Sequence, residues 1–153
     1  MRHFRSVMAV LVVVAAVAAC GGGSDSTPPS PPAFTNLAAT RWSVVDTVSA
    51  ANSCNAPIGT TDSWILHVIG QSGNNIAFYD ERGLVADAVN GTMSGYVISY
   101  SGNRYPIQGC VDMTASYAVT LDTGGTSFSG TATIYCNDAP PCYVPVNVAG
   151  TKL

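Results

Sequence analysis

The feature that most restricts the fold of this chain is an alternation of apolar and polar residues with a period of two, which begins near Leu37. In segment 127–136, one face of an extended chain carries Phe128, Ala132 and Ile134, whereas the other face is rich in serine and threonine. Successive side chains of a β-strand point to opposite faces, so this pattern predicts a half-buried strand. The other predicted strands are 42–48, 63–69, 75–80, 84–89, 92–100, 117–121 and 144–148. No segment has the pattern of an amphipathic helix of ten or more residues, so the sequence predicts an all-β fold.

Short segments rich in turn-forming residues separate these strands. They lie at 70–74, 80–83, 90–91 and 122–125. Asn90-Gly91 is the strongest hairpin signal, because both residues tolerate positive φ. Such local connections predict an antiparallel, up-and-down barrel of about eight strands, in which no sheet edge is exposed. A two-sheet β-sandwich is the alternative, and the longest break, between Tyr100 and Ser116, is expected to fold over one end.

The N-terminal residues have the layout of an export signal. Arg2, His3 and Arg5 precede an unbroken run of 13 apolar residues from Val7 to Ala19. A membrane-spanning helix needs about 20 apolar residues, so this run is too short for a stable anchor. Its length suits the core of a signal peptide instead.

The sequence Val17-Ala18-Ala19-Cys20 resembles the lipobox of bacterial lipoprotein precursors. The resemblance implies cleavage of residues 1–19, diacylglycerol on the Cys20 sulfur, and a further acyl chain such as palmitate on the new amine. Two or three acyl chains hold a protein firmly on a membrane. Gly21 implies the outer membrane, on its periplasmic or its surface side, in a diderm cell, and the outer face of the cytoplasmic membrane in a monoderm cell. Ordinary secretion with an unmodified Cys20 thiol is the alternative.

Residues 20–36 are predicted to be a tether for a single β domain, residues 37–153. Segment 21–33 has four prolines, one charge and no bulky apolar side chain, so its burial cannot offset the entropy of ordering. Residues 20–153 contain four Arg and Lys against nine Asp and Glu, which gives a net charge of −5. This balance argues against nucleic-acid partners, and we expect membrane contact through the acyl chains alone.

Four cysteines remain beside Cys20, namely Cys54, Cys110, Cys136 and Cys142. An even number in an exported chain predicts two disulfides. Cys136 and Cys142 flank a turn-prone loop, so this local pair is favoured, which leaves Cys54 to Cys110. No cysteine pair has C-x-x-C spacing, so no metal site is expected.

The mature chain has no recognisable catalytic or cofactor motif. A Ser-His-Asp site would need His67, the single mature histidine, which we interpret as an ordinary residue of a predicted strand. The adjacent carboxylates Asp80 and Glu81 would point to opposite faces or lie in a turn, which does not suit a glycosidase pair. We therefore expect no enzyme activity and no cofactor. A hydrolase, the remaining alternative, would require two carboxylates that converge in a cleft.

Three tyrosines are the candidate ligand-binding residues. Tyr96 and Tyr100 share one face of a predicted strand, and Tyr105 follows in the long break. Rings and hydroxyls at the mouth of a barrel suit an apolar or sugar-like ligand. The alternative is that the same rings fill the core.

Trp42 on the first predicted strand and Lys152 after the last loosely resemble a feature of lipocalin barrels, a tryptophan beneath a cation at the closed end. The chain departs from that family because Thr40 replaces glycine two residues before the tryptophan, and the cation is lysine rather than arginine. The resemblance implies a lipocalin-like barrel that binds a small apolar ligand without catalysis. The alternative is a structural or interaction protein with a filled barrel, whose partner is another envelope protein.

Overall fold

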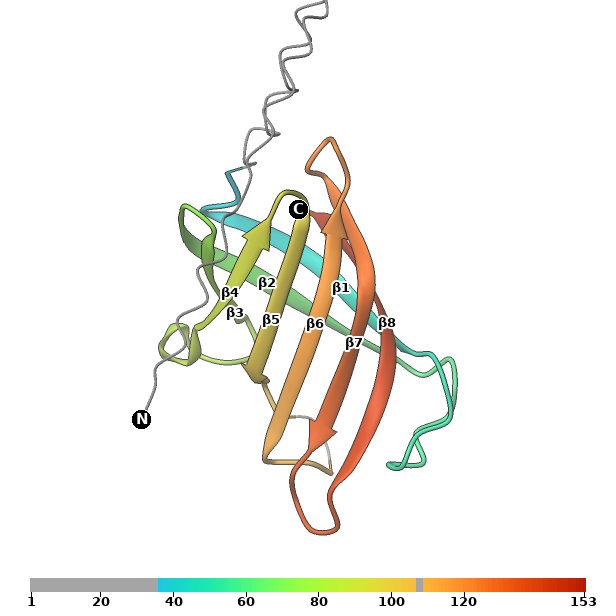
Figure 1. Cartoon of the computed structure of the whole chain (residues 1–153). Coiled ribbons are helices and arrows are strands. Elements are labelled where there is room, and N and C mark those ends of the chain that lie inside the picture. Colours follow the sequence, from blue (N-terminus) through green and yellow to red (C-terminus); the bar gives the residue numbers. More distant parts are fainter. Residues whose placement is uncertain (1–35, 107–108) are drawn as a thin grey trace, which may run out of the picture. The chain divides into compact units, whose positions relative to one another are not determined.

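Figure 1 shows the computed structural model, which describes residues 36–106 and 109–153. These residues form a closed barrel of eight antiparallel strands, each hydrogen-bonded to the next and β8 to β1. The strands are β1 (Thr40–Val48), β2 (Thr61–Ser72), β3 (Asn75–Asp80), β4 (Val89–Ser94), β5 (Val97–Asn103), β6 (Met113–Leu121), β7 (Ser127–Cys136) and β8 (Cys142–Lys152). The predicted all-β, up-and-down barrel is confirmed, and the sandwich alternative is wrong.

The period-two pattern places alternate residues of each strand inside the barrel. On β1, Trp42, Val44, Asp46 and Val48 are buried, and the residues between them are partly exposed. Every other strand contributes buried counterparts, among them Val68, Phe78, Met93, Tyr100, Val119, Ala132 and Val148. Burial of each large apolar side chain contributes about 1.5–3 kcal/mol, so the interior supplies the main stabilisation of the closed sheet.

The two ends of the barrel differ in their connections. At the end that we call the closed end, the turns 73–74, 95–96 and 122–126 are short, and residues 36–39 and the C-terminus also lie there. At the opposite end, the loop end, the connections are 49–60, 81–88, 137–141 and the one between β5 and β6, of which 104–106 and 109–112 are described. Leu37 is 1% exposed and its N–H donates to Oε1 of Gln71 at 2.7 Å, so the N-terminal residues of the domain cover the closed end.

The turns predicted within 70–74, 80–83 and 122–125 are confirmed. The long break is shorter than predicted, because β5 continues to Asn103 and β6 begins at Met113.

Segment 92–100, predicted as one strand, is a hairpin whose turn contains Gly95 at a φ of 61°. The predicted turn at Asn90-Gly91 is also wrong, since both residues lie inside β4. The physical reason is that the ring of Phe78 needs the space that a side chain at position 91 would fill. A Cβ on Gly91 would lie 3.0 Å from Cε1 of Phe78, so this glycine admits a neighbouring ring instead of making a turn.

Segment 84–89 is wrong as a strand, because Val85–Asp87 forms a 3-10 turn, η1. The Asp87 carboxylate accepts a hydrogen bond from the N–H of Leu84 at 2.9 Å, and such local bonds compete with strand pairing. This error removes one predicted strand and the hairpin at Gly95 adds one, so the predicted number of eight still matches the structure.

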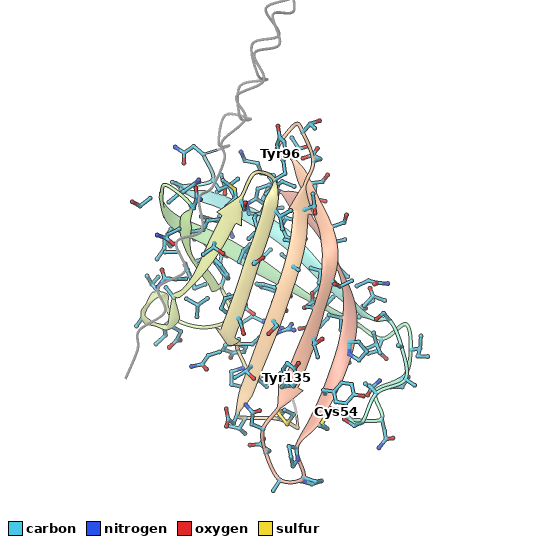
Figure 2. The ribbon with its side chains drawn as sticks, viewed as in Figure 1. Cys54, Tyr96 and Tyr135 are labelled. Atoms are coloured by element: carbon cyan, nitrogen blue, oxygen red, sulfur yellow. A yellow bond between two sulfur atoms is a disulfide. The ribbon has the colours of Figure 1, made fainter. Side chains whose placement is uncertain are left out.

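All four cysteines form disulfides as predicted, but the predicted pairing is wrong. The bonds join Cys54 to Cys142 and Cys110 to Cys136, and Figure 2 shows Cys54 at the loop end. Cys136 and Cys142 are opposite each other in the β7–β8 register, so backbone hydrogen bonds already close that hairpin. Each sulfur instead ties a long loop to the hairpin, over sequence separations of 88 and 26 residues. Longer closures remove more entropy from the unfolded chain.

The predicted signal peptide 1–19, Cys20 and nearly all of the tether 20–36 lie outside the described residues, and these predictions stay predictions. Within 36–106 and 109–153, no helix has the length and hydropathy needed to cross a bilayer.

Candidate functional site

The barrel contains a cavity of about 580 Å³. Its walls come from all eight strands and are mainly apolar, with contributions from Val44, Leu66, Val68, Ile76, Phe78, Val89, Ile98, Val119, Phe128 and Val148. Pockets that hold small organic ligands measure roughly 300–1,000 Å³ and combine apolar walls with a few polar groups. The cavity therefore has the size and the lining of a ligand site.

Trp42 forms the floor of this cavity at the closed end. Its ring is 1% exposed and packs against Phe128 at a centroid distance of 5.4 Å, and Nε1 donates to Oγ1 of Thr40 at 2.8 Å. Lys152 is the register partner of Trp42 on β8, but its side chain is exposed. The barrel and the buried tryptophan are consistent with the lipocalin-like resemblance.

The mouth of the cavity lies between the β3–β4 and β5–β6 connections at the loop end. Gly83, Ala86 and Asp87 line it on one side, and Tyr105 and Val111 on the other. The guanidinium of Arg82 lies over the Tyr105 ring, 5.4 Å from its centroid, which holds the ring beside the opening.

The three candidate tyrosines do not gather at one place. Tyr100 and Tyr105 line the cavity, whereas Tyr96 lies in the turn between β4 and β5 at the closed end (Figure 2) and packs partly buried against the core. Tyr100 is 8% exposed, packs edge-on against Phe78, and donates its hydroxyl to the carbonyl of Asn103. Burial raises the pKa of Tyr100 to about 12, so this hydroxyl stays protonated at neutral pH.

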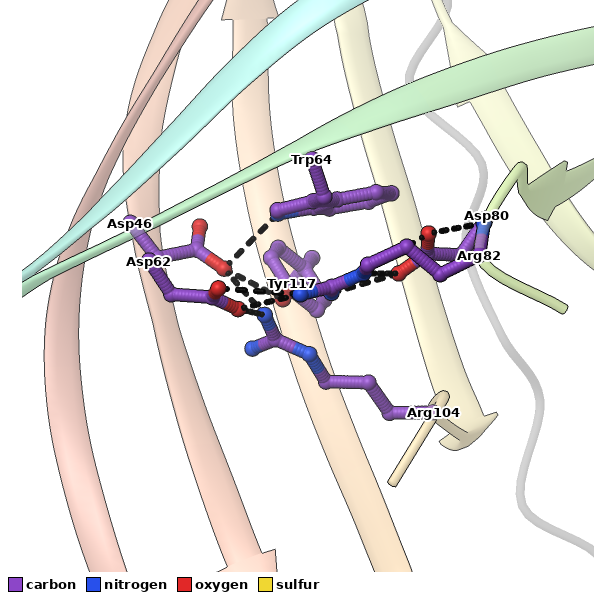
Figure 3. Close-up of polar contacts among 7 residues, drawn as sticks. All are labelled: Asp46, Asp62, Trp64, Asp80, Arg82, Arg104 and Tyr117. Carbon is purple, nitrogen blue, oxygen red and sulfur yellow. Dashed lines mark hydrogen bonds and ion pairs between the residues drawn. The ribbon is translucent and has the colours of Figure 1, made fainter. Parts of the chain in front are cut away.

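Polar side chains from β1, β2, β6 and the loop end meet beside the cavity (Figure 3). Nη2 of Arg104 forms ion pairs with Oδ2 of Asp46 at 2.9 Å and with Oδ2 of Asp62 at 2.6 Å. Arg104 and Asp46 are buried, with side chains only 4% and 1% exposed. Oδ2 of Asp46 also accepts hydrogen bonds from Nε1 of Trp64 at 3.0 Å and from the hydroxyl of Tyr117 at 3.1 Å.

Arg82 joins this group to a third carboxylate. Its Nη1 lies 2.9 Å from Oδ1 of Asp62, and its Nη2 lies 2.6 Å from Oδ2 of Asp80. We call the set Asp46, Asp62, Asp80, Arg82 and Arg104 the Asp–Arg cluster. With every member ionised, three aspartates and two arginines give the cluster a net charge of −1.

The surroundings shift the protonation equilibria of the cluster. Burial raises the pKa of Asp46, and the charge of Arg104 and the hydrogen bonds from Trp64 and Tyr117 offset part of the rise. Burial also raises the pKa of Tyr117, which keeps its hydroxyl available as a donor. For Arg82, burial alone would lower the pKa, but hydrogen bonds to Asp80 and Asp62 outweigh it and raise the pKa.

Sequence reasoning did not identify Asp46 or Arg104. A signal for Asp46 exists, because it alternates with Trp42, Val44 and Val48 on the apolar face of its strand, where a charged residue needs a partner. Arg104 carries no comparable signal, since it follows β5 in a connection without periodicity.

Of the remaining candidate groups, His67 and Glu81 do not line the cavity, whereas Asp80 lines it as a member of the Asp–Arg cluster. His67 lies on strand β2 as predicted, stacks on Tyr79, and has its Nδ1 3.3 Å from Oε1 of Glu81. Glu81 is held by Arg41 at 2.6 Å, whereas Asp80 is held by Arg82. The two adjacent carboxylates therefore serve different ion pairs.

One group of metal-ligating atoms occurs in the described part of the chain, namely those of Cys110, Cys136 and Asp138. Both sulfurs belong to the Cys110–Cys136 disulfide, so neither is a thiolate that could bind an ion.

Comparisons with protein-family models, with curated proteins and with solved structures find no match for this chain. The candidate site therefore stands on its own geometry, a mainly apolar chamber with one buried, charge-paired arginine in its wall.

Proposed function

We propose that this protein is a lipid-anchored lipoprotein of the bacterial cell envelope, and that its barrel is a non-catalytic binding module for a small, mainly apolar ligand. The observation that carries the binding role is the cavity of about 580 Å³ with its apolar walls. A barrel with a purely structural role would gain from filling this space, because an unfilled apolar void forfeits packing contacts. The cavity thus supports the binding role over the filled-barrel alternative.

The surroundings of the mouth suit the entry of an apolar molecule. Leu84 and Val111 lie in the two connections that border the opening, and they are 71% and 78% exposed. Large exposed apolar side chains next to an apolar cavity are typical of interaction or ligand-entry surfaces.

The anchoring part of the proposal rests on the lipobox-like sequence that ends at Cys20. The described part of the barrel domain starts with Asn36 and Leu37 at the closed end. The mouth of the cavity is at the opposite end of the barrel, the loop end.

A hydrolase would need two carboxylates that converge in a cleft, and Asp46 and Asp62 do converge, on Nη2 of Arg104. Both carboxylates, however, form ion pairs, and Oδ2 of Asp46 accepts two further hydrogen bonds. Oδ1 of Asp46 is buried without a partner within the described residues, but neither Asp46 nor Asp62 lines the cavity. A general base needs a lone pair that faces the substrate. The observed bonding supports a structural role of these carboxylates in holding Arg104.

Binding is tested with the uncharged fluorescent dye N-phenyl-1-naphthylamine. We expect the emission of the dye to rise when it binds the wild type. In Ile98→Trp, the dissociation constant of the dye should be at least tenfold higher, because Ile98 lines the cavity and the larger ring would occupy it. The matched control is Val97→Trp, on the neighbouring residue of β5, whose side chain is 43% exposed. Equal affinity of the two variants, or no dye binding to the wild type, would refute the binding role.

Anchoring is tested by metabolic labelling with radioactive palmitate in the host of the protein. We expect the wild type to be labelled and Cys20→Ser to remain unlabelled, since the acyl chains are expected on the Cys20 sulfur and amine. Cys54→Ser is the control and should keep the label, because Cys54 belongs to a disulfide in the barrel. Equal labelling of the wild type and Cys20→Ser would contradict the proposal.

A further inference from the structure

Arg104 has hydrogen-bonding capacity that no described residue uses. Its side chain is 4% exposed and belongs to the cavity wall. Nη2 is occupied by Asp46 and Asp62, but Nε and Nη1 are buried without a hydrogen-bond partner within the described residues. Oδ1 of Asp46 is also buried without a partner there, but Asp46, unlike Arg104, does not line the cavity. Nε and Nη1 of Arg104 carry three N–H groups, because a guanidinium has five donors in total.

Buried donors are rarely left unpaired, because desolvation without a hydrogen bond is costly. The unpaired N–H groups of Arg104 therefore require an acceptor, and they belong to a residue that lines a chamber of ligand size. The acceptor that suits them is an oxygen atom of the ligand.

The charge of the Asp–Arg cluster limits what this oxygen can belong to. Asp46 and Asp62 already place two carboxylates on Arg104, at 2.9 and 2.6 Å. A ligand carboxylate would be a third anion around one guanidinium, in a cluster whose net charge is −1 when ionised. A ligand ammonium group offers no acceptor and would face the same N–H donors. An uncharged acceptor pairs with the N–H donors and adds no third anion beside Asp46 and Asp62.

The position of Arg104 indicates how such a ligand would lie. The residue follows β5 at the loop end, and the apolar walls formed by Val68, Ile76 and Phe128 extend from there to Trp42 at the closed end. A ligand oxygen at Arg104 would therefore be near the mouth, with the apolar part of the ligand in the chamber.

We propose that the cavity binds an uncharged amphiphile, an aliphatic or ring-containing molecule whose hydroxyl, amide or ester oxygen accepts hydrogen bonds from Nε and Nη1 of Arg104. This inference rests on the proposed binding function and specifies the ligand class for the same cavity. The carboxylates of Asp46 and Asp62 repel anionic amphiphiles such as fatty-acid anions and so lower their affinity.

The test compares two probes of equal chain length, decan-1-ol and decanoate, as competitors of N-phenyl-1-naphthylamine near neutral pH. In the wild type, decan-1-ol should displace the dye at a concentration at least tenfold lower than decanoate. We call the concentration of decanoate that displaces the dye, divided by that of decan-1-ol, the competition ratio. An alcohol is intrinsically more apolar than a carboxylate, so the decisive quantity is the change of the competition ratio between variants.

Asp62→Asn removes one anion from Arg104 at a side chain that is 30% exposed, so the barrel should tolerate it. We expect the competition ratio, decanoate over decan-1-ol, to fall at least tenfold in Asp62→Asn, and to fall further in Asp46→Asn/Asp62→Asn. The control Asp122→Asn removes the same charge from an exposed turn at the closed end and should leave the ratio unchanged. If Asp62→Asn does not fold, Asp46→Asn, an isosteric change, provides the same comparison.

The outcomes separate the two proposals. If the dye does not bind the wild type, the binding function fails. If the dye binds but the ratio is the same in the wild type, Asp62→Asn and Asp122→Asn, the assignment of an uncharged ligand to Arg104 is overturned while the binding function stands.

Discussion

Replacement of Arg104 by methionine is expected to lower the free energy of unfolding by about 3–5 kcal/mol at neutral pH, because it leaves a buried carboxylate without its cation. Asp46 is 2% exposed, and Arg104 is its ion-pair partner at 2.9 Å. Asp62 is less affected, because it is 30% exposed and keeps its ion pair with Arg82. Methionine fills a similar volume, so the loss reports on charge more than on packing.

The loss of unfolding free energy in Arg104→Met should depend on pH. Burial already raises the pKa of Asp46 in the folded state, and removal of the Arg104 charge, which opposes this rise, should raise the pKa further. A carboxyl with a raised folded pKa stabilises the folded state below its ordinary pKa, and this contribution is lost as the pH increases through the folded value. Arg104→Met should therefore be much less destabilised near pH 4, where Asp46 can take up a proton, than near pH 7.

Urea unfolding of the oxidised protein, followed by tryptophan fluorescence at both pH values, measures this effect. Arg104→Met/Asp46→Asn is the matched control, because it removes both charges and should recover much of the stability near pH 7. A second control, Arg41→Met, breaks the exposed pair with Glu81 and should change stability little at either pH. An equal loss for Arg104→Met at both pH values would show that Asp46 is not the source of the penalty.

The alternation of side chains was sufficient to predict the class of fold and most of its strands. It places Phe128, Ala132 and Ile134 on one face of a strand, and the structure buries all three. It failed where a glycine has two possible roles. Gly91 and Gly95 look alike in sequence, but Gly91 makes room for the Phe78 ring inside β4, whereas Gly95 makes the turn. The distinction depends on a ring from another strand, which local sequence does not encode.

The candidate site was predictable only in part, for a related reason. Asp46 could have been singled out as a charge on an apolar face, but its partner Arg104 comes from a connection that the barrel brings close only after closure. The prediction of the disulfide pairing failed for the same reason, because the bonded cysteines are brought together only by the folded barrel. Cys136 is six residues from Cys142 in sequence, yet it bonds to Cys110, because the folded barrel brings residues 109–112 next to the start of the β7–β8 connection.

Substitution of Gly130 by alanine is expected to lower the free energy of unfolding by about 4 kcal/mol or more, beyond the usual range for overpacking. Gly130 lies on β7 opposite Val119 of β6. A Cβ at this position would lie 2.1 Å from the carbonyl oxygen of Ala118 and 2.6 Å from Cα of Val119. Both atoms belong to the main chain of the neighbouring strand, so relief requires the β6–β7 ladder to separate.

Gly150 on β8 provides the matched comparison, because its Cβ would be equally close, 2.1 Å, to a side chain, the ring of Phe128. That ring can move, so Gly150→Ala should cost only about 1–3 kcal/mol. The cost of Gly150→Ala should shrink further in a Phe128→Leu background, whereas the cost of Gly130→Ala should be the same in both backgrounds. Urea unfolding of these single and double variants measures the coupling. A cost of Gly130→Ala no larger than that of Gly150→Ala would contradict the close approach of β6 and β7 that lets the eight strands close around the cavity.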